Sequence, residues 1–126
     1  MQVSWKKAEV EEIEKKYSSL DLAQEQRDNI KFYGDFVAKF IPLSSMVIQG
    51  IFSFSIRDWE QAHPGKNFVA EARGPNGLEA ATKLNKICKE KIKALVRDPA
   101  DLEKVENAFD QALKSFAELG APSENK

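Results

Sequence analysis

The chain has 126 residues, enough for one domain with a substantial core and too few for two ordinary domains. Its 19 Lys and Arg residues nearly balance 20 Asp and Glu residues, so no global field attracts nucleic acid or an anionic membrane. A single cysteine, Cys88, excludes an intrachain disulfide and favours a reducing compartment. With a charged N-terminus that carries no secretory signal, we expect one cytoplasmic domain over residues 1–126, with a short disordered tail from about residue 120.

The first predicted element is an amphipathic helix near the N-terminus. Apolar residues recur at spacings of three and four, while Glu and Lys pairs four apart occupy the outer face. The repeat is too short for a coiled coil. The inner seam consists of Val3, Val10, Ile13, Tyr17 and Leu20.

The second predicted helix runs from Leu22 to Ile41, with Ser19 or Asp21 as its N-cap. Its amphipathic pattern predicts one face turned toward the core. The residues expected on that face are Ile30, Tyr33, Val37, Phe40 and Ile41.

Three aromatic residues lie off the central lines of these two seams. Phe32 and Phe36 belong to the second helix, and Trp5 belongs to the first segment. Exposed aromatics on charged helices often mark interfaces, although a broad core accounts for the same positions. We predict that Trp5, Phe32 and Phe36 form a protein-binding or self-association surface.

The third predicted element is the most apolar stretch, because residues 40–56 carry no charge. It is too short to cross a bilayer as a helix and contains several polar residues, so a membrane span is not expected. From Leu43 to Ala62 the pattern is apolar nearly all round, which predicts a central helix with Pro42 in its first turn and an end at residues 63–65. The alternative is a short hairpin between residues 51–56 and 67–72.

Explicit boundary signals delimit the last two predicted helices. Asn76 and Glu79 have the spacing of a capping box, and Asp98 with Pro99 opens the final helix after a minimal turn. Between residues 63 and 77 we expect irregular structure. The inner stripes are Leu84, Cys88, Ile92 and Leu95 in the fourth helix, and Leu102, Val105, Phe109, Ala112, Leu113 and Phe116 in the fifth. The sequence therefore predicts an all-α, five-helix up-and-down bundle around an apolar third helix.

Four basic residues lie opposite the apolar stripe of the fourth predicted helix. They are Lys86, Lys89, Lys93 and Arg97. Such a face is suited to an anionic partner, whereas the simpler interpretation is a solvated face with pairing across to the acidic fifth helix. No aromatic residue is interleaved to stack on bases, so nucleic acid is not an expected partner.

The sequence lacks the residue patterns typical of metal and cofactor sites. One histidine and one cysteine cannot make a Cys/His metal site, and Cys88 falls on a core-facing stripe. We predict no metal and no cofactor.

The residues "RDWEQAH", from Arg57 to His63, resemble the R-D-x4-H form of the Arg and His motif of HEPN-family ribonucleases, which are small helical domains. The resemblance implies that Arg57 and His63 act on the scissile phosphate across a dimer, with His63 in proton transfer. The alternative from the residues themselves is a histidine at a helix end that helps to cap carbonyl groups.

The function expected from these patterns is a non-catalytic cytoplasmic interaction or regulatory module that binds a protein partner or itself as a homodimer. One alternative is a HEPN-like, metal-independent ribonuclease using Arg57 and His63. Another is a helical domain that inserts reversibly at a membrane surface, because its third helix is apolar nearly all round.

Overall fold

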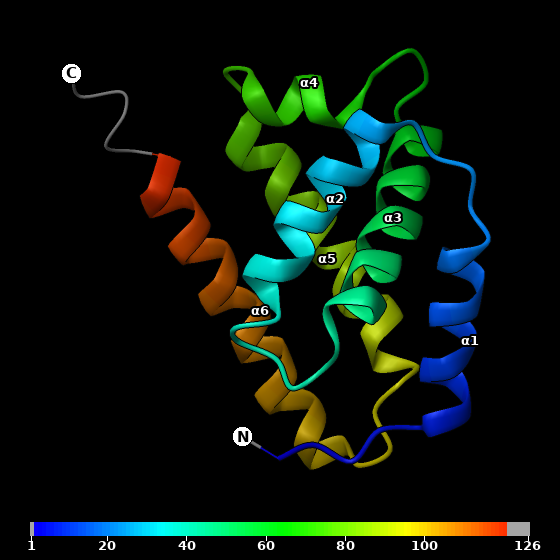
Figure 1. Ribbon diagram of the computed structural model, residues 1–126. Helices are drawn as coiled ribbons and strands as arrows, with labels where there is room; N and C mark the ends of the chain where they lie inside the picture. The colour runs from blue at the N-terminus through cyan, green and yellow to red at the C-terminus, as the bar shows by residue number, and fades with distance from the viewer. Residues whose placement is uncertain (1, 121–126) are drawn as a thin grey trace.

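The computed structural model describes residues 2–120 of the chain, and the side chains of residues 2–115. Helices make up nearly all of its secondary structure, as predicted, so the all-α class is confirmed (Figure 1). The predicted number of five helices is wrong, and the up-and-down arrangement is not confirmed. In chain order the six helices of the described part are α1 (Lys7–Ser18), α2 (Gln24–Val37), α3 (Ser45–Ala62), α4 (Phe68–Arg73), α5 (Gly77–Lys93) and α6 (Pro99–Gly120). Most of the predicted disordered tail lies outside the described residues.

The additional helix is α4, which lies in the stretch predicted to be irregular. Asn67 caps it, because its side-chain oxygen accepts a hydrogen bond from the N–H of Ala70 at 3.1 Å. Phe68 is buried and anchors this short helix to the core. The hairpin alternative is also wrong, since residues 51–56 lie within α3 and residues 67–72 contribute the cap and body of α4.

The starts of α2 and α3 differ from the predicted ones. The N-cap of α2 is Ala23, whose N–H donates to the Gln26 side chain at 3.3 Å, whereas Ser19 donates its hydroxyl to the preceding helix. Ser44 caps α3 by accepting from the N–H of Val47 at 3.3 Å, and Pro42 lies before the helix. A serine hydroxyl provides the acceptor that a proline lacks, which explains the later start of α3.

The two capping signals of the C-terminal half have different outcomes. Asp98 caps α6 as predicted, because its carboxylate accepts from the N–H of Ala100 at 3.0 Å. Asn76 occupies the cap position of α5, but its side chain makes no capping hydrogen bond. Its φ of −99° and ψ of 22° lie outside the extended region that capping residues adopt. Glu79 forms an ion pair with Lys83 instead, at 3.3 Å.

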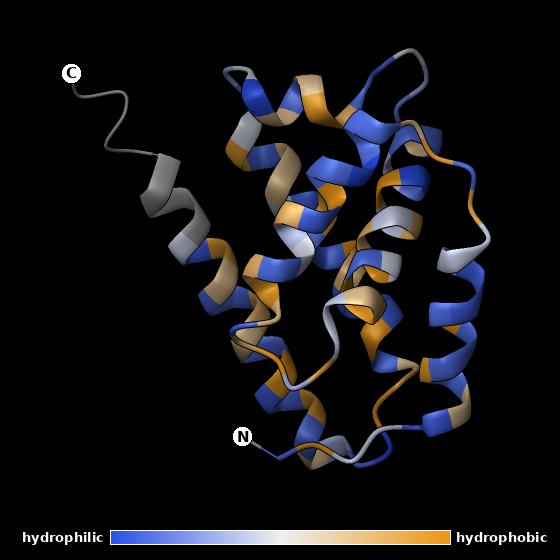
Figure 2. Cartoon of the chain, in the orientation of Figure 1, coloured by the Kyte–Doolittle hydropathy of each residue, from blue (hydrophilic) through white to orange (hydrophobic). Residues whose placement is uncertain are grey.

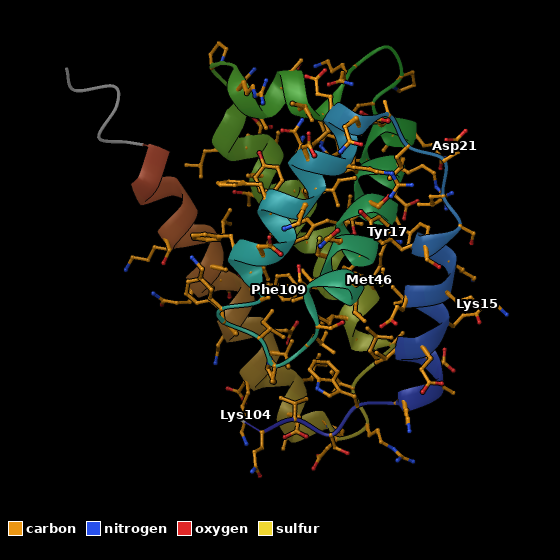
Figure 3. All side chains as sticks on the ribbon, in the orientation of Figure 1. Lys15, Tyr17, Asp21, Met46, Lys104 and Phe109 are labelled. Atoms are coloured by element: carbon orange, nitrogen blue, oxygen red, sulfur yellow. The ribbon has the colours of Figure 1, made fainter. Side chains whose placement is uncertain are left out.

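α3 is the central helix, as predicted, and contacts α1, α2, α4 and α5 (Figure 1). Its buried positions include Ile48 and Ile51, which have no exposed surface. Tyr17 lies between α1 and α3, where its hydroxyl donates to the side-chain oxygen of Gln49 at 3.1 Å (Figure 3). In contrast, the visible outer face of α1 is almost entirely hydrophilic (Figure 2).

The predicted inner stripes of α5 and α6 are confirmed where they can be followed. Every predicted inner residue from Leu84 to Leu95 is buried. On α6 the buried residues are Val105, Phe109 and Ala112, while Leu102 and Leu113 are partly buried. The side chain of Phe116 lies outside the described residues.

One end of the bundle is closed by the residues before α1, Ser4 to Lys6, which we call the N-terminal clip. The N–H of Lys6 donates to the carbonyl of Leu95 at 2.7 Å, and the N–H of Arg97 donates to the carbonyl of Ser4 at 3.0 Å. The N–H of Ser4 also donates to the carboxylate of Asp101 at 2.9 Å. The N-terminal clip is therefore hydrogen-bonded to the turn between α5 and α6 and to the start of α6.

Candidate functional site

A pocket of about 520 Å³ lies between α2, α4, α5 and α6. Ligand-binding pockets of proteins typically measure roughly 300–1,000 Å³. The wall is mainly apolar and is open to solvent on one side. Its aromatic lining consists of Tyr33, Phe36, Phe52, Phe68 and Phe109. We call this site the apolar pocket.

The position of α6 explains why the pocket forms there. α6 packs mainly on α5 and touches α2 only lightly, and it inclines away from the other helices toward its C-terminal end (Figure 1). Phe109 and Ala112 on α6 face this space, opposite Tyr33 and Val37 on α2. A helix that diverges from its neighbour leaves a space that the side chains do not fill.

A close approach between α4 and α5 shapes another wall of the pocket. A side chain at Gly77 would bring a Cβ to within 2.3 Å of the carbonyl oxygen of Ala72. Such a distance is far below van der Waals contact, so glycine at position 77 permits the tight turn between the two helices. Gly74, Pro75 and Gly77 all line the pocket beside Arg73.

The pocket carries one positive charge at this edge. Arg73 is the one charged residue among the described residues that line it, and its guanidinium donates to the side-chain oxygen of Asn29 at 3.4 Å. In the described part of the chain Arg73 forms no ion pair. Burial raises the pKa of the Tyr33 hydroxyl, while the nearby positive charge of Arg73 acts in the opposite direction.

Two exposed apolar residues extend the pocket wall to the surface. Phe32 on α2 is 58% exposed and packs edge-to-face against Tyr33, with ring centroids 5.7 Å apart. Leu78 on α5 is 63% exposed and lines the pocket itself. We call these two residues the apolar rim.

The three predicted interface aromatics occupy two separate places. Phe36 lines the apolar pocket, and Phe32 lies one turn away on the same face of α2. Trp5 belongs to the N-terminal clip, where it forms a β-bridge with Val96 and packs against the core. Trp5 is therefore at the turn end of the α5–α6 hairpin, whereas the pocket is lined by the opposite end.

The side chains of Arg57 and His63 make separate contacts in the structure. The guanidinium of Arg57 lies over the ring of Phe54, 5.3 Å from its centroid. His63 stacks on the indole of Trp59 at 4.2 Å, and its Nδ1 donates to the carbonyl oxygen of Trp59 at 2.8 Å. His63 lines a small pocket of about 70 Å³ that Arg57 does not reach. This carbonyl contact is the one expected of a histidine at a helix end.

The basic residues predicted to face an anionic partner are not all available. Lys86, Lys93 and Arg97 are exposed, whereas Lys89 is partly buried and pairs with Asp110 of α6. A second ion pair joins Lys91 to Asp58 of α3 at 2.6 Å. Part of the positive charge of α5 is therefore used in pairing between helices.

The described residues form neither a metal-binding site nor a reactive thiol site. No group of three or more His, Cys, Asp or Glu residues is placed to hold a metal ion there. Cys88 is fully buried, and burial raises the pKa of its thiol to about 12. The thiol therefore stays protonated and unreactive near neutral pH. Over the same part of the chain, no helix is both long and apolar enough to cross a membrane.

No protein-family model, curated protein or solved structure matches this chain. The function is therefore inferred from the geometry of the pocket. Sequence patterns did not indicate Tyr33 and Leu78 as site residues. Leu78 had one available signal, since it is a large apolar residue that lies outside the inner stripe beginning at Leu84.

Proposed function

We propose that the chain is a non-catalytic interaction module that binds an amphipathic helix of a protein partner along the apolar rim. The observation that carries this proposal is the exposure of Leu78 on the pocket wall and of Phe32 beside the pocket, where it packs against Tyr33. Apolar surface that continues from a pocket into solvent is typical of sites covered by another macromolecule. A helix laid into a groove inserts apolar anchors at a spacing of three and four residues.

Two basic side chains beside the pocket further define the proposed partner. The ammonium of Lys39 lies over the ring of Phe36, 5.7 Å from its centroid, and Arg73 lies across the pocket on α4. Asp110, on α6, is already paired with Lys89. A partner helix with acidic residues beside its apolar stripe therefore complements this surface.

The test compares a rim variant with a control of the same chemistry. The rim variant is Phe32→Lys with Leu78→Lys, and the control is Met46→Lys, which changes another exposed apolar residue on α3 (Figure 3). Proteins captured from a native lysate are identified, and the isolated helical segment of each is titrated against the pure chain. Hydrogen exchange then maps the protected residues.

The proposal predicts protection of the facing parts of α2 and α5, and binding that is at least about tenfold weaker for the rim variant but unchanged for the control. Equal binding by both variants would overturn it. Sedimentation measures self-association of the chain and of the rim variant. If the chain self-associates and the rim variant does not, the partner is a second copy of this chain.

The ribonuclease and membrane-surface alternatives stay predictions. For the first, Arg57 and His63 make separate contacts on α3. For the second, the apolar surface of α3 is covered by four other helices in the folded chain. No observation in the described part of the chain favours either over the interaction module.

A further inference from the structure

We propose that the apolar pocket also binds a free aliphatic carboxylate, with the hydrocarbon chain inside the pocket and the carboxylate against Arg73. This inference goes beyond the protein partner and does not depend on it. The volume and apolar lining of the pocket and the charge of Arg73 carry the inference, whereas the exposed rim carries the proposed function.

The inner part of the pocket suits a hydrocarbon chain. Val37, Leu84, Phe109 and Ala112 line it and are buried, and Phe52 adds an aromatic wall from α3. Transfer of apolar ligand surface from water into such a site is favourable in proportion to the area removed from water. The volume of about 520 Å³ leaves room for a small ligand without displacement of a helix.

The edge of the pocket near α4 suits an anionic head group. The guanidinium of Arg73 is held by the neutral side chain of Asn29, and a planar guanidinium binds a carboxylate through two parallel hydrogen bonds. Tyr33 lines the same pocket as Arg73. The N-terminus of α5 adds the positive end of its dipole at Gly77, where the Asn76 side chain provides no cap.

The same arrangement disfavours cationic and neutral chains. No Asp or Glu occurs among the described residues that line the pocket, so an ammonium head group would meet Arg73 without compensation. An alcohol head group would form a neutral hydrogen bond, which is weaker than one between two charged groups. The pocket should therefore rank chains of equal length by the charge of the head group.

The experiment is isothermal titration calorimetry of the full chain with dodecanoate below its micelle concentration. Dodecan-1-ol and dodecyltrimethylammonium serve as probes with the same hydrocarbon length. The expected result is one saturable site for dodecanoate, with affinity at least about tenfold higher than for the alcohol or the ammonium. Absence of saturable binding, or equal affinity for the three probes, would overturn the proposal.

Two charge-reversed variants locate the head group. Arg73→Glu should weaken dodecanoate binding by about tenfold or more, whereas Lys86→Glu makes the same change at an exposed site of α5 outside the pocket and should have no effect. Nuclear Overhauser contacts from dodecanoate to the methyl groups of Leu84 and Ala112 should place the hydrocarbon chain inside. Equal binding by both variants, or contacts elsewhere, would contradict this placement.

A variant of the rim separates this inference from the proposed function. Phe32 does not line the pocket, so Phe32→Lys should retain dodecanoate binding while it weakens binding of the partner helix. Loss of dodecanoate binding in this folded variant would show that the ligand lies on the rim, which contradicts the inference. Failure to find a protein partner would leave the calorimetric result unaffected.

Discussion

α3 and α6 are the two longest helices of the described structure, and they bury their apolar residues in different ways. α3 is surrounded by α1, α2, α4 and α5, whereas α6 packs on α5 and touches α2 only lightly. Ile51 of α3 is fully buried, while Leu113 of α6 is partly buried and lines the apolar pocket. The comparison shows that the apolar residues of α3 are covered by other helices, whereas part of the apolar face of α6 borders an open pocket.

The largest expected effect is the loss of a large side chain beside α3. Ile51→Ala should lower the free energy of unfolding by about 2–5 kcal/mol, because the cavity it leaves is enclosed on all sides. Leu113→Ala should cost clearly less, since its side chain already borders an open pocket. Urea unfolding followed by circular dichroism measures both. An equal loss would show that α6 is packed as tightly as α3.

A smaller loss is expected at Gly50, where α1 packs closely against α3. A Cβ at Gly50 would lie 2.8 Å from Cγ2 of Ile13 and 3.1 Å from Cβ of Tyr17, and neither atom is the flexible end of a side chain. Gly50→Ala should therefore destabilise the chain by about 1–2 kcal/mol, despite the better helix propensity of alanine. Gly74→Ala is the control, because its Cβ has no contact closer than 3.4 Å. A more stable Gly50→Ala protein would contradict this account of the contact.

The interface between α3 and α5 should also respond to pH through Cys88. Burial raises the pKa of its thiol to about 12 from 9.0, so above pH 9 the unfolded chain releases this proton while the folded chain retains it. This proton release leaves the free energy of unfolding unchanged well below pH 9 and lowers it as the pH rises toward 12. The loss is about 1 kcal/mol at pH 10. Urea unfolding at pH 8 and pH 10 should show this loss relative to Cys88→Ala. Parallel pH profiles of the two proteins would mean that the thiol is hydrated.

The smallest change in stability is expected at the apolar rim. Leu78→Ser removes a side chain that is 63% exposed, so the free energy of unfolding should change by no more than about 0.5 kcal/mol. Thermal and urea unfolding provide the measurement. A loss close to that of Ile51→Ala would show that Leu78 supports the fold, and its role in the proposed interface would then lose its basis.

The sequence predicted the features that depend on one helix at a time. The buried stripe from Leu84 to Leu95 follows from helical periodicity, and the Asp98 cap follows from side-chain chemistry. α4 was missed because a helix of six residues is too short to display a period. Its signal was present in Asn67, a good N-cap residue three positions before Ala70.

The apolar pocket was beyond this type of prediction, because it depends on how four helices are inclined to one another. Periodicity placed Phe109 correctly on the inner face of α6, but it could not show whether α2 would fill the space opposite. For the same reason, the three aromatic residues predicted to form one interface lie in two separate places. Phe32 and Phe36 lie together on α2, whereas Trp5 is carried by a segment whose partner, the α5–α6 turn, is remote in sequence.

The N-terminal clip has a consequence for the order of events during synthesis. Ser4 and Asp101 are joined by a hydrogen bond although they are 97 positions apart, so the hydrogen bonds of the clip to the α5–α6 turn cannot form until α5 and the start of α6 have left the ribosome. Contacts between distant positions also form slowly, because a long loop must close before they can be made. Each newly made chain therefore completes this end of its fold by docking the clip, which emerged before α5 and α6, onto the turn between these two helices.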